Sequence, residues 1–282
     1  MPHRARVRRA LILLGPALAA GSATAQAELV LGVLPNISSV TLAAQYELLR
    51  AYVEKRDGTR LRVVLPGSFK AFFDATLRGD FDLAVAAPHF ARVAHLDAKL
   101  VPLVMYEPRI AAQLITLVDS PLAGVRGLRG KALALANPSS LVAMYGQQWL
   151  RSQGLEPGKD YETKGARTDM GVGRMLLSGE VAAAIMSGGE LRALPPDEAA
   201  RLKVVEEFAR IPNFIVLGHP RLGDERLARL KAQLLAFGTD RLDGAAFAKA
   251  TGFSAIVDVD PATLRELDPY TAATRRAMGV AP

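Results

Sequence analysis

Short apolar runs alternate with amphipathic helical segments along this chain, and this alternation restricts the fold more than any other feature. Residues 29–34 form the first apolar run, and residues 38–57 follow with apolar positions at helical spacing. Two further runs, at 61–65 and 81–86, enclose a second helical segment at 69–77. Because the connections are only a few residues long, each helix returns the chain to a neighbouring parallel strand. The sequence therefore predicts an α/β fold whose parallel sheet is covered by helices on both faces.

A second unit of the same kind follows the first. Its strands are predicted at 131–135 and 181–186, with helices between them. Extended apolar segments near Ile115 and Ile215 lead out of the first unit and back into it. When a chain passes twice between two lobes in this way, the lobes form a cleft with a hinge. Open α/β sheets bind ligands at the carboxyl ends of their strands. We expect a mostly parallel sheet flanked by helices in each lobe. The predicted lobes are residues 28–118 plus 215–282 and residues 119–214.

The first 27 residues have the layout of a cleavable secretory signal peptide. Four arginines occur within the first nine residues, an apolar run covers 10–20, and small residues end in two A-x-A sites. We expect cleavage before Gln26 or Glu28 and export to the periplasm by the general route. An uncleaved anchor and twin-arginine export are the alternatives. Because much of the formal charge of +7 lies in this segment, the charge gives no support to a nucleic-acid partner.

Several chemistries are excluded by residues or motifs that the chain lacks. It has no cysteine, which excludes disulfides, thiolate metal sites and cysteine nucleophiles. Its four histidines do not have the spacing of metal ligands, so no metal is expected. The sequence contains no P-loop, no dinucleotide-binding glycine motif and no G-x-S-x-G motif. We therefore predict no cofactor and no catalytic residue. After the leader, no segment has eighteen uninterrupted apolar residues.

Four short stretches carry a resemblance to a known family. They are Gly32-Val33-Leu34-Pro35, Pro66-Gly67-Ser68-Phe69, Asn137-Pro138-Ser139-Ser140, and Thr168-Asp169 followed by Ser178-Gly179-Glu180. In their order and spacing they resemble the periplasmic solute-binding proteins of phosphate, phosphite and phosphonate ABC importers, over about residues 29–267. The resemblance implies the two-lobe type II periplasmic binding fold. It also implies a binding protein that closes on a small molecule and presents it to a membrane permease, rather than an enzyme.

The candidate pocket departs from that family by the loss of polar groups. Where the phosphonate binders carry further hydroxyls, this chain has Leu141 and Val142. Phe69 stands in the place of the family's tyrosine, and Phe214 in the place of an acidic residue after Pro-Asn. A buried phosphonate needs charge-assisted hydrogen bonds, and fewer donors remain here. We therefore expect a small organic anion, phosphonate-like or of carboxylate type, rather than free phosphate.

Nine residues are predicted to face the cleft because they lie at strand carboxyl ends, at helix amino ends or within the matching stretches. They are Ser68, Phe69, His89, Phe90, Ser139, Ser140, Thr168, Asp169 and Asn213. Structural alternatives exist, because the serines and Asp169 can cap helices, Phe69 can be a core ring, and His89 can be packed away from any ligand. Three arginines can each clamp a carboxylate or simply be solvated, namely Arg109, Arg167 and Arg210.

Two classes of function remain open. The leading hypothesis is a monomeric, non-catalytic periplasmic protein that binds a small molecule and delivers it to the permease of an ABC importer. A variant of this hypothesis delivers the closed form to a membrane sensor kinase. The rival is an exported enzyme, because some enzymes of cofactor biosynthesis share the two-lobe fold. The chain shows no evident pair of acid and base for such an enzyme, and fold alone does not decide between the two.

Overall fold

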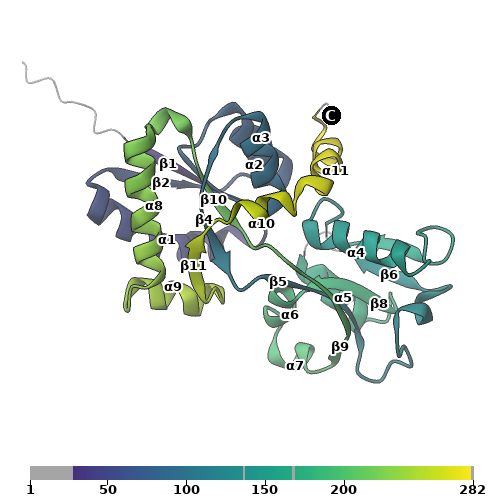
Figure 1. Ribbon diagram of the computed structural model, residues 1–282. Coiled ribbons are helices and arrows are strands. Elements are labelled where there is room, and N and C mark those ends of the chain that lie inside the picture. The colour runs from purple at the N-terminus through teal and green to yellow at the C-terminus, as the bar shows by residue number, and fades with distance from the viewer. Residues whose placement is uncertain (1–27, 136, 167–168, 281–282) are drawn as a thin grey trace, which may run out of the picture.

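Two lobes, each built on its own β-sheet, make up the part of the chain that the computed structural model describes, residues 28–135, 137–166 and 169–280 (Figure 1). The predicted signal peptide lies outside these residues. The first sheet contains β1 (Glu28–Val33), β2 (Arg60–Val64), β3 (Leu83–Ala86), β4 (Val101–Glu107), β10 (Ile215–Gly218) and β11 (Ala255–Asp258). The second contains β5 (Ile110–Leu117), β6 (Ala132–Leu135), β7 (Glu162–Gly165), β8 (Ala183–Ser187) and β9 (Leu202–Ile211). Their strand orders are β11-β4-β10-β3-β1-β2 and β7-β6-β8-β5-β9.

Helices cover both faces of each sheet. In the first lobe one cover is formed by α1 (Ser39–Asp57), α8 (Asp224–Gly238) and α9 (Asp243–Thr251). The other is formed by α2 (Phe69–Arg78), α3 (Pro88–Asp97) and α11 (Asp268–Met278), with the short α10 (Pro261–Arg265) leading into it. In the second lobe, α4 (Leu141–Ser152) lies on one face, and α5 (Asp169–Leu177), α6 (Gly188–Arg192) and α7 (Pro196–Ala199) lie on the other. Two single 3-10 turns complete the elements, η1 (Val125–Leu128) and η2 (Pro220–Leu222).

Helix α1 shows why the sequence pattern predicts the helices well. Ser38 caps it by accepting a hydrogen bond from the amide of Thr41, as the predicted serine cap requires. Its buried positions are the apolar residues at helical spacing, Leu42, Tyr46, Leu49, Tyr52 and Val53. Gly58 ends the helix with φ of 69°, a left-handed conformation that glycine adopts without steric cost. The predicted segment 38–57 is therefore confirmed to within one residue.

The strand directions are mixed rather than mostly parallel. Only β1, β2 and β3 in the first sheet, and β6, β7 and β8 in the second, form parallel neighbours. The strands by which the chain enters each sheet from the other lobe pair antiparallel with these, as β10 does with β3 and β5 does with β8. The reason is geometric: a strand that enters a sheet from the edge facing the other lobe runs against strands that end at that edge.

The two crossings lie at residues 108–109, between β4 and β5, and at residues 212–214, between β9 and β10. Ile115 therefore does not lie on a crossing, and residues 110–117, predicted in the first lobe, pair within the second sheet. Their apolar run has another cause. Strand β5 is an inner strand covered on both faces, and Leu114 and Ile115 are both completely buried. Ile215 is the first residue of β10 and thus adjoins its crossing, as predicted.

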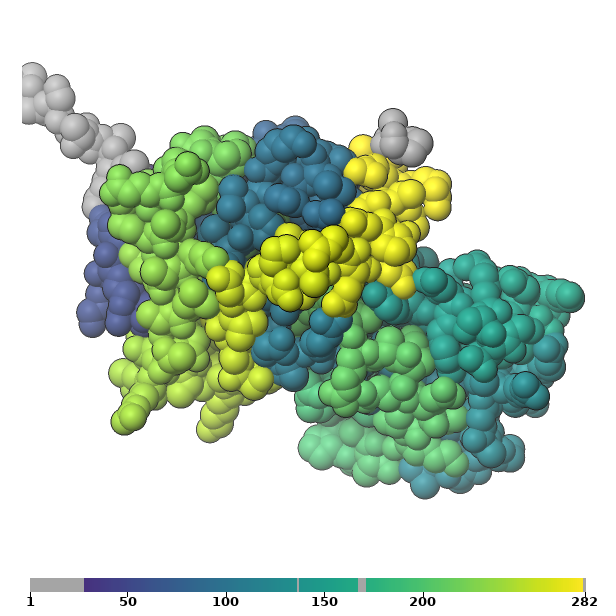
Figure 2. All heavy atoms as spheres, viewed as in Figure 1, coloured from purple at the N-terminus to yellow at the C-terminus, as the bar shows by residue number. Residues whose placement is uncertain are grey.

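Apolar packing joins the lobes into one body. A single hydrophobic cluster includes Phe72 and Phe90 of the first lobe together with Leu135 and Leu141 of the second. On the surface, the carboxyl-terminal segment of the first lobe reaches the second lobe next to α4 (Figure 2, yellow against teal). The orientation of the two lobes is thus fixed by side-chain contacts as well as by the two crossings.

Candidate functional site

The amino ends of helices from both lobes meet at the interface between the sheets. Strands β2 and β3 of the first sheet lead into α2 and α3, and β6 of the second sheet leads toward α4. A hydrogen bond joins the two lobes here, between Nε2 of His89, at the start of α3, and the carbonyl oxygen of Ser139, just before α4. The N···O distance is 2.9 Å. The structure therefore brings together two of the residues predicted for the cleft.

His89 is completely buried, and its environment fixes its protonation. A carbonyl oxygen can only accept, so Nε2 donates and carries the proton of a neutral ring. Burial lowers the pKa of His89 from 6.5 to about 4, although the bond to Ser139 acts in the opposite direction. Nδ1 is then an acceptor, and it has no hydrogen-bond partner among the described residues. At neutral pH this histidine offers a buried lone pair and no positive charge.

Ser68 and Ser140 both cap helices, as the structural alternative for them supposed, and Ser68 is exposed. Ser68 accepts from the amide of Ala71 at the start of α2, and Ser140 accepts from the amide of Ala143 at the start of α4. Capping uses a lone pair of the hydroxyl oxygen and leaves its proton available to donate. The first-turn amides of a helix also lack partners within the helix. A serine cap at such a place can therefore stabilise its helix and still donate to an oxyanion.

The two predicted phenylalanines differ in exposure. Phe90 is 1% exposed and packs edge-on against Phe73, with ring centroids 5.1 Å apart, so it is a core ring. Phe69 is only half-buried and meets Phe90 edge-on at 6.0 Å. Phe69 is thus the ring that can contact a ligand, and the buried ring of Phe90 packs against it. Phe214, the last residue of the second crossing, is also half-buried.

Asn213 joins the two crossings. Its Nδ2 donates to the carbonyl oxygen of Pro108 at 2.7 Å, and its Oδ1 accepts from the amide of Phe214 at 2.7 Å. The side chain is 4% exposed. Asn213 was predicted as a ligand-binding residue, but its amide atoms are already engaged in a bridge between the two segments that connect the lobes. Thr168 lies outside the described residues, and Asp169 is the first residue of α5.

A further serine cap at the same edge was not recognised in the sequence. Strand β8 is parallel to β6, so it ends at the edge where α4 begins. There Ser187 accepts from the amide of Glu190 at 3.0 Å, and a carboxylate oxygen of Glu190 accepts from the amide of Ser187 at 2.6 Å. This reciprocal pair is a capping box, and its Ser-x-x-Glu spacing after a predicted strand was the signal that could have revealed it.

A second contact between the lobes involves residues that the sequence did not single out. The ring of Tyr270, on α11, stacks on that of Tyr145, on α4, with centroids 4.3 Å apart and planes inclined by 18°. The hydroxyl of Tyr270 donates to Oε1 of Gln148 at 2.8 Å. Nearby, Arg109 forms an ion pair with Glu266 and donates to the carbonyl oxygen of Arg210. Arg109 thus links the two crossing segments, and its guanidinium group is already engaged rather than free to bind an anion.

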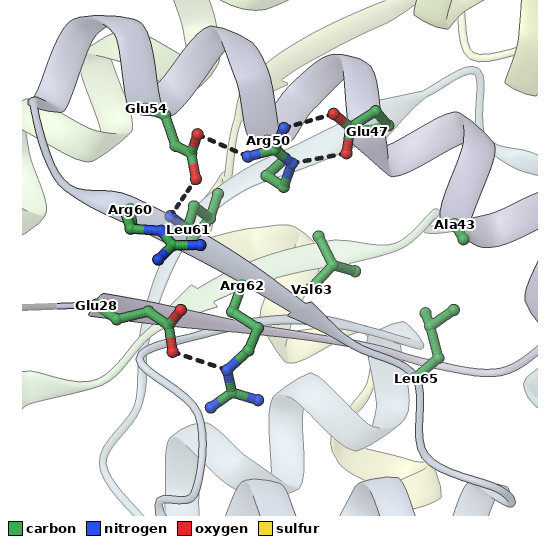
Figure 3. A pocket seen from close by; sticks show the side chains of 10 residues that line it. All are labelled: Glu28, Ala43, Glu47, Arg50, Glu54, Arg60, Leu61, Arg62, Val63 and Leu65. Carbon is green, nitrogen blue, oxygen red and sulfur yellow. Dashed lines mark hydrogen bonds and ion pairs between the residues drawn. The ribbon is translucent and has the colours of Figure 1, made fainter.

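A hollow of about 510 Å³ lies elsewhere, between α1 and the edge strand β2 (Figure 3). It is lined by Glu28, Ala43, Glu47, Arg50, Glu54, Arg60, Leu61, Arg62, Val63 and Leu65. Arg50 pairs with both Glu47 and Glu54, and Glu28 pairs with Arg62. Its volume would admit a small molecule, but most of its charges are paired with one another, and none of the predicted site residues lines it. We therefore place the candidate site at the interface between the lobes.

Neither a metal site nor a membrane span appears in the described part of the chain. Within residues 28–135, 137–166 and 169–280, no three histidine, aspartate or glutamate side chains are grouped as metal ligands would be. No helix among these residues is both long and apolar enough to cross a bilayer.

Comparison with known proteins gives a family and a fold. The family model described as "ABC transporter, phosphonate, periplasmic substrate-binding protein" matches residues 31–264. A binding protein component of an ABC phosphonate transporter from Pseudomonas aeruginosa, PA3383, is 16% identical, with 90% of this chain and 89% of that chain covered and a TM-score of 0.75. PhnD1 from Prochlorococcus marinus, in complex with methylphosphonate, is 11% identical, with coverage of 89% and 98% and a TM-score of 0.77.

A third similar structure binds another kind of organic anion. The alkanesulfonate-binding protein SsuA from Xanthomonas axonopodis pv. citri, bound to MOPS, is 19% identical, with coverage of 90% and 94% and a TM-score of 0.62. A comparison with curated proteins found no match. At these identities the solved structures establish the fold, and they confirm the predicted two-lobe periplasmic binding fold of type II.

Proposed function

This chain belongs to the periplasmic phosphonate-binding family of ABC transporters, whose members are non-catalytic, and from that premise we propose that it captures a small organic anion between its lobes and delivers it to an importer. The proposal rests on one observation above all. His89 at the amino end of α3 and Ser139 at the amino end of α4 are in direct contact across the interface. Helix amino ends carry partial positive charge, so their convergence from two lobes favours an anion between them.

The donors at this interface suit an oxyanion. Ser68 and Ser140 keep their hydroxyl protons while they cap α2 and α4, and the first-turn amides add further donors. His89 contributes no positive charge at neutral pH. The anion would therefore be held by hydrogen bonds from neutral groups, which provide direction as well as attraction.

The walls of the interface favour a carbon skeleton over a bare ion. Phe69 and Phe214 are half-buried rings. Leu141 and Val142, where the family carries further hydroxyls, are buried and apolar. Methylphosphonate in PhnD1 and MOPS in SsuA show that relatives of this fold accept organic anions. Inorganic phosphate is strongly hydrated and needs donors on every side, so we expect this chain to bind it poorly.

Export completes the proposal. The family is periplasmic, and the amino-terminal 27 residues have the features of a cleavable leader. We expect the mature chain to begin at Gln26 or Glu28. Intact-mass measurement of the exported protein checks this, and a mass that retains Met1 would contradict it.

Calorimetric titration tests the ligand class. Purified protein is titrated with methylphosphonate, with an alkanesulfonate and with inorganic phosphate under identical conditions. We expect at least one organic anion to bind at least tenfold more tightly than phosphate. Tight binding of phosphate, with no binding of either organic anion, would overturn the proposed ligand class.

A further inference from the structure

We propose that α11 is an inter-lobe clasp, in which Tyr270 and Tyr145 are positioning residues that set the orientation of α4 and hence the affinity of the cleft. This inference rests on the proposed function, because it concerns the regulation of the same cleft. Neither tyrosine lies among the residues predicted to touch a ligand, and the clasp acts through the helix whose amino end carries Ser140.

Helix α11 is fixed to the first lobe by two ion pairs with α3. Arg92 pairs with Asp268 at 2.6 Å, and Arg275 binds Asp97 through two hydrogen bonds of 2.6 and 2.9 Å. The inner face of α11 is buried as well, at Thr274 and Met278. The helix therefore moves with the first lobe when the lobes change their relative position.

The same helix makes a specific contact with the second lobe. Tyr270 is 9% exposed, and its ring lies on that of Tyr145 at 4.3 Å. Its hydroxyl donates to Gln148, one turn further along α4. Burial raises the pKa of both tyrosines, so both hydroxyls keep their protons at neutral pH. A stacked ring pair with a directed hydrogen bond fixes both the distance and the rotation of α4 relative to α11.

The first lobe thus holds α4 at two points. His89 contacts the backbone just before its first turn, and Tyr270 contacts its second and third turns. A helix of twelve residues is stiff over this length, so the contact at Tyr145 helps to set where the amino end of α4 points. Both contacts join the two lobes, and only the one at His89 adjoins the proposed ligand.

The segment that leads into α11 is also tied to the hinge. Glu266 forms an ion pair with Arg109, in the first crossing, and Arg109 donates to the carbonyl oxygen of Arg210, near the end of β9. Movement about the crossings therefore changes the position of Tyr270 relative to α4. We therefore expect the clasp and the hinge to move together, so that the Tyr270–Tyr145 contact forms or breaks as the angle between the lobes changes.

A pair of spin labels measures the distance between the lobes without any ligand. The chain has no cysteine, so Leu242→Cys in the first lobe and Val118→Cys in the second, which are 78% and 53% exposed, give unique labelling sites. In pulsed electron paramagnetic resonance we expect Tyr270→Ala to lower the ratio of closed to open molecules about tenfold, or about 1.4 kcal/mol. Tyr270→Phe keeps the stacked ring and should shift the ratio less. Arg276→Ala, an exposed change on α11, is the control and should leave it unchanged.

A second variant separates the clasp from damage to α11. Tyr145→Ala removes the stacked ring from the other lobe, keeps the hydrogen bond of Tyr270 to Gln148, and leaves the ion pairs of α11 with α3 untouched. We expect Tyr145→Ala to open the lobes, though less than Tyr270→Ala does, and the double variant to open them no further than Tyr270→Ala. Distances equal to those of the parent in both single variants would overturn the clasp. Additive effects in the double variant would overturn it as well, because they would mean that the two rings act independently.

Failure of the clasp is distinguishable from failure of the proposed function. The label distances are recorded in buffer alone, whereas the ligand class is decided by calorimetry with methylphosphonate, an alkanesulfonate and phosphate. Where methylphosphonate or the alkanesulfonate binds, Tyr270→Ala should weaken that binding about tenfold. Unchanged binding together with opened lobes would show that α11 controls closure but not affinity, and would overturn the assignment of Tyr270 as a positioning residue.

Discussion

The two contacts that join the lobes differ in chemistry, and the difference separates the binding of a ligand from the control of closure. At the amino end of α4, His89 meets a backbone carbonyl and keeps a buried lone pair without a partner among the described residues. On the second and third turns of α4, Tyr270 stacks on Tyr145 and its hydroxyl is satisfied by Gln148. Unsatisfied polar atoms are costly when buried, so Nδ1 of His89 is suited to accept a hydrogen bond from a donor group, whereas the oxygens of an anion need the donors at Ser140 and at the first-turn amides. The contact at Tyr270 is already satisfied and is suited to stay in place.

Acid should destabilise the buried environment of His89 and spare the contact at Tyr270, because protonation at Nδ1 leaves Nε2–H donating to Ser139 but places a positive charge in a completely buried site. The pKa of His89 is lowered to about 4 in the folded chain, so between pH 6.5 and 4 the unfolded chain binds a proton that the folded chain does not. Stability that is fully present above pH 6.5 is therefore lost as the pH falls, by about 3 kcal/mol at pH 4.

Urea unfolding of the parent and of His89→Gln at pH 7 and at pH 4 measures this loss. Glutamine keeps a donor for the carbonyl of Ser139 but does not titrate, so the variant should lose less stability on acidification. Carboxylates titrate in the same pH range in both proteins. The contribution of His89 is therefore the difference between the two losses of unfolding free energy from pH 7 to pH 4. An equal loss in both would show that His89 has no part in the acid response.

Ser140→Asp should abolish anion binding without unfolding α4. Aspartate is as good a helix cap as serine, but it has no proton to donate and adds a negative charge at the proposed anion site. We expect the affinity for the organic anion to fall at least a hundredfold, with a melting temperature close to that of the parent. Ser140→Thr is the matched control, because it keeps both the cap and the hydroxyl. If the aspartate variant binds as tightly as the threonine variant, the anion is not held at α4.

Asn213→Ala should weaken both contacts together. The change leaves the carbonyl of Pro108 and the amide of Phe214 without their shared partner, which costs about 2 kcal/mol of stability. Since the bridge connects the two crossings, we expect the spin-label distances to broaden rather than to shift. Thermal unfolding and the label pair measure the two effects. A variant with unchanged stability and a narrow distance distribution would show that Asn213 does not hold the crossings together.

How far the sequence predicts this molecule depends on whether a feature is local. The serine caps and the buried positions of α1 follow from spacing along one segment, and they agree with the structure. Strand β5 was assigned to the first lobe because an apolar run does not reveal which sheet buries it. The partners of Asn213 and Tyr270 lie 105 and 122 residues away in sequence, so no local pattern could show that one joins the crossings and the other joins the lobes.

The smallest effect is expected for a substitution in the hollow beside β2. Arg60→Ala removes a cation from its lining and should leave the affinity for the organic anion unchanged, because the proposed site lies between the lobes. Calorimetry under the conditions used for the parent checks this. A clear loss of affinity in this variant would indicate that the anion binds at the edge of the first lobe, and it would contradict the role assigned to α4.

The central claim is that the anion lies between the amino ends of α3 and α4 and holds the lobes together. The most direct measurement is the distance between spin labels at Leu242→Cys and Val118→Cys, recorded before and after addition of the organic anion that binds most tightly by calorimetry. The account predicts that the distance distribution narrows toward the closed form in the parent, and that the same anion has no effect on it in Ser140→Asp. An anion that binds at a single site while the distribution stays unchanged would contradict the account.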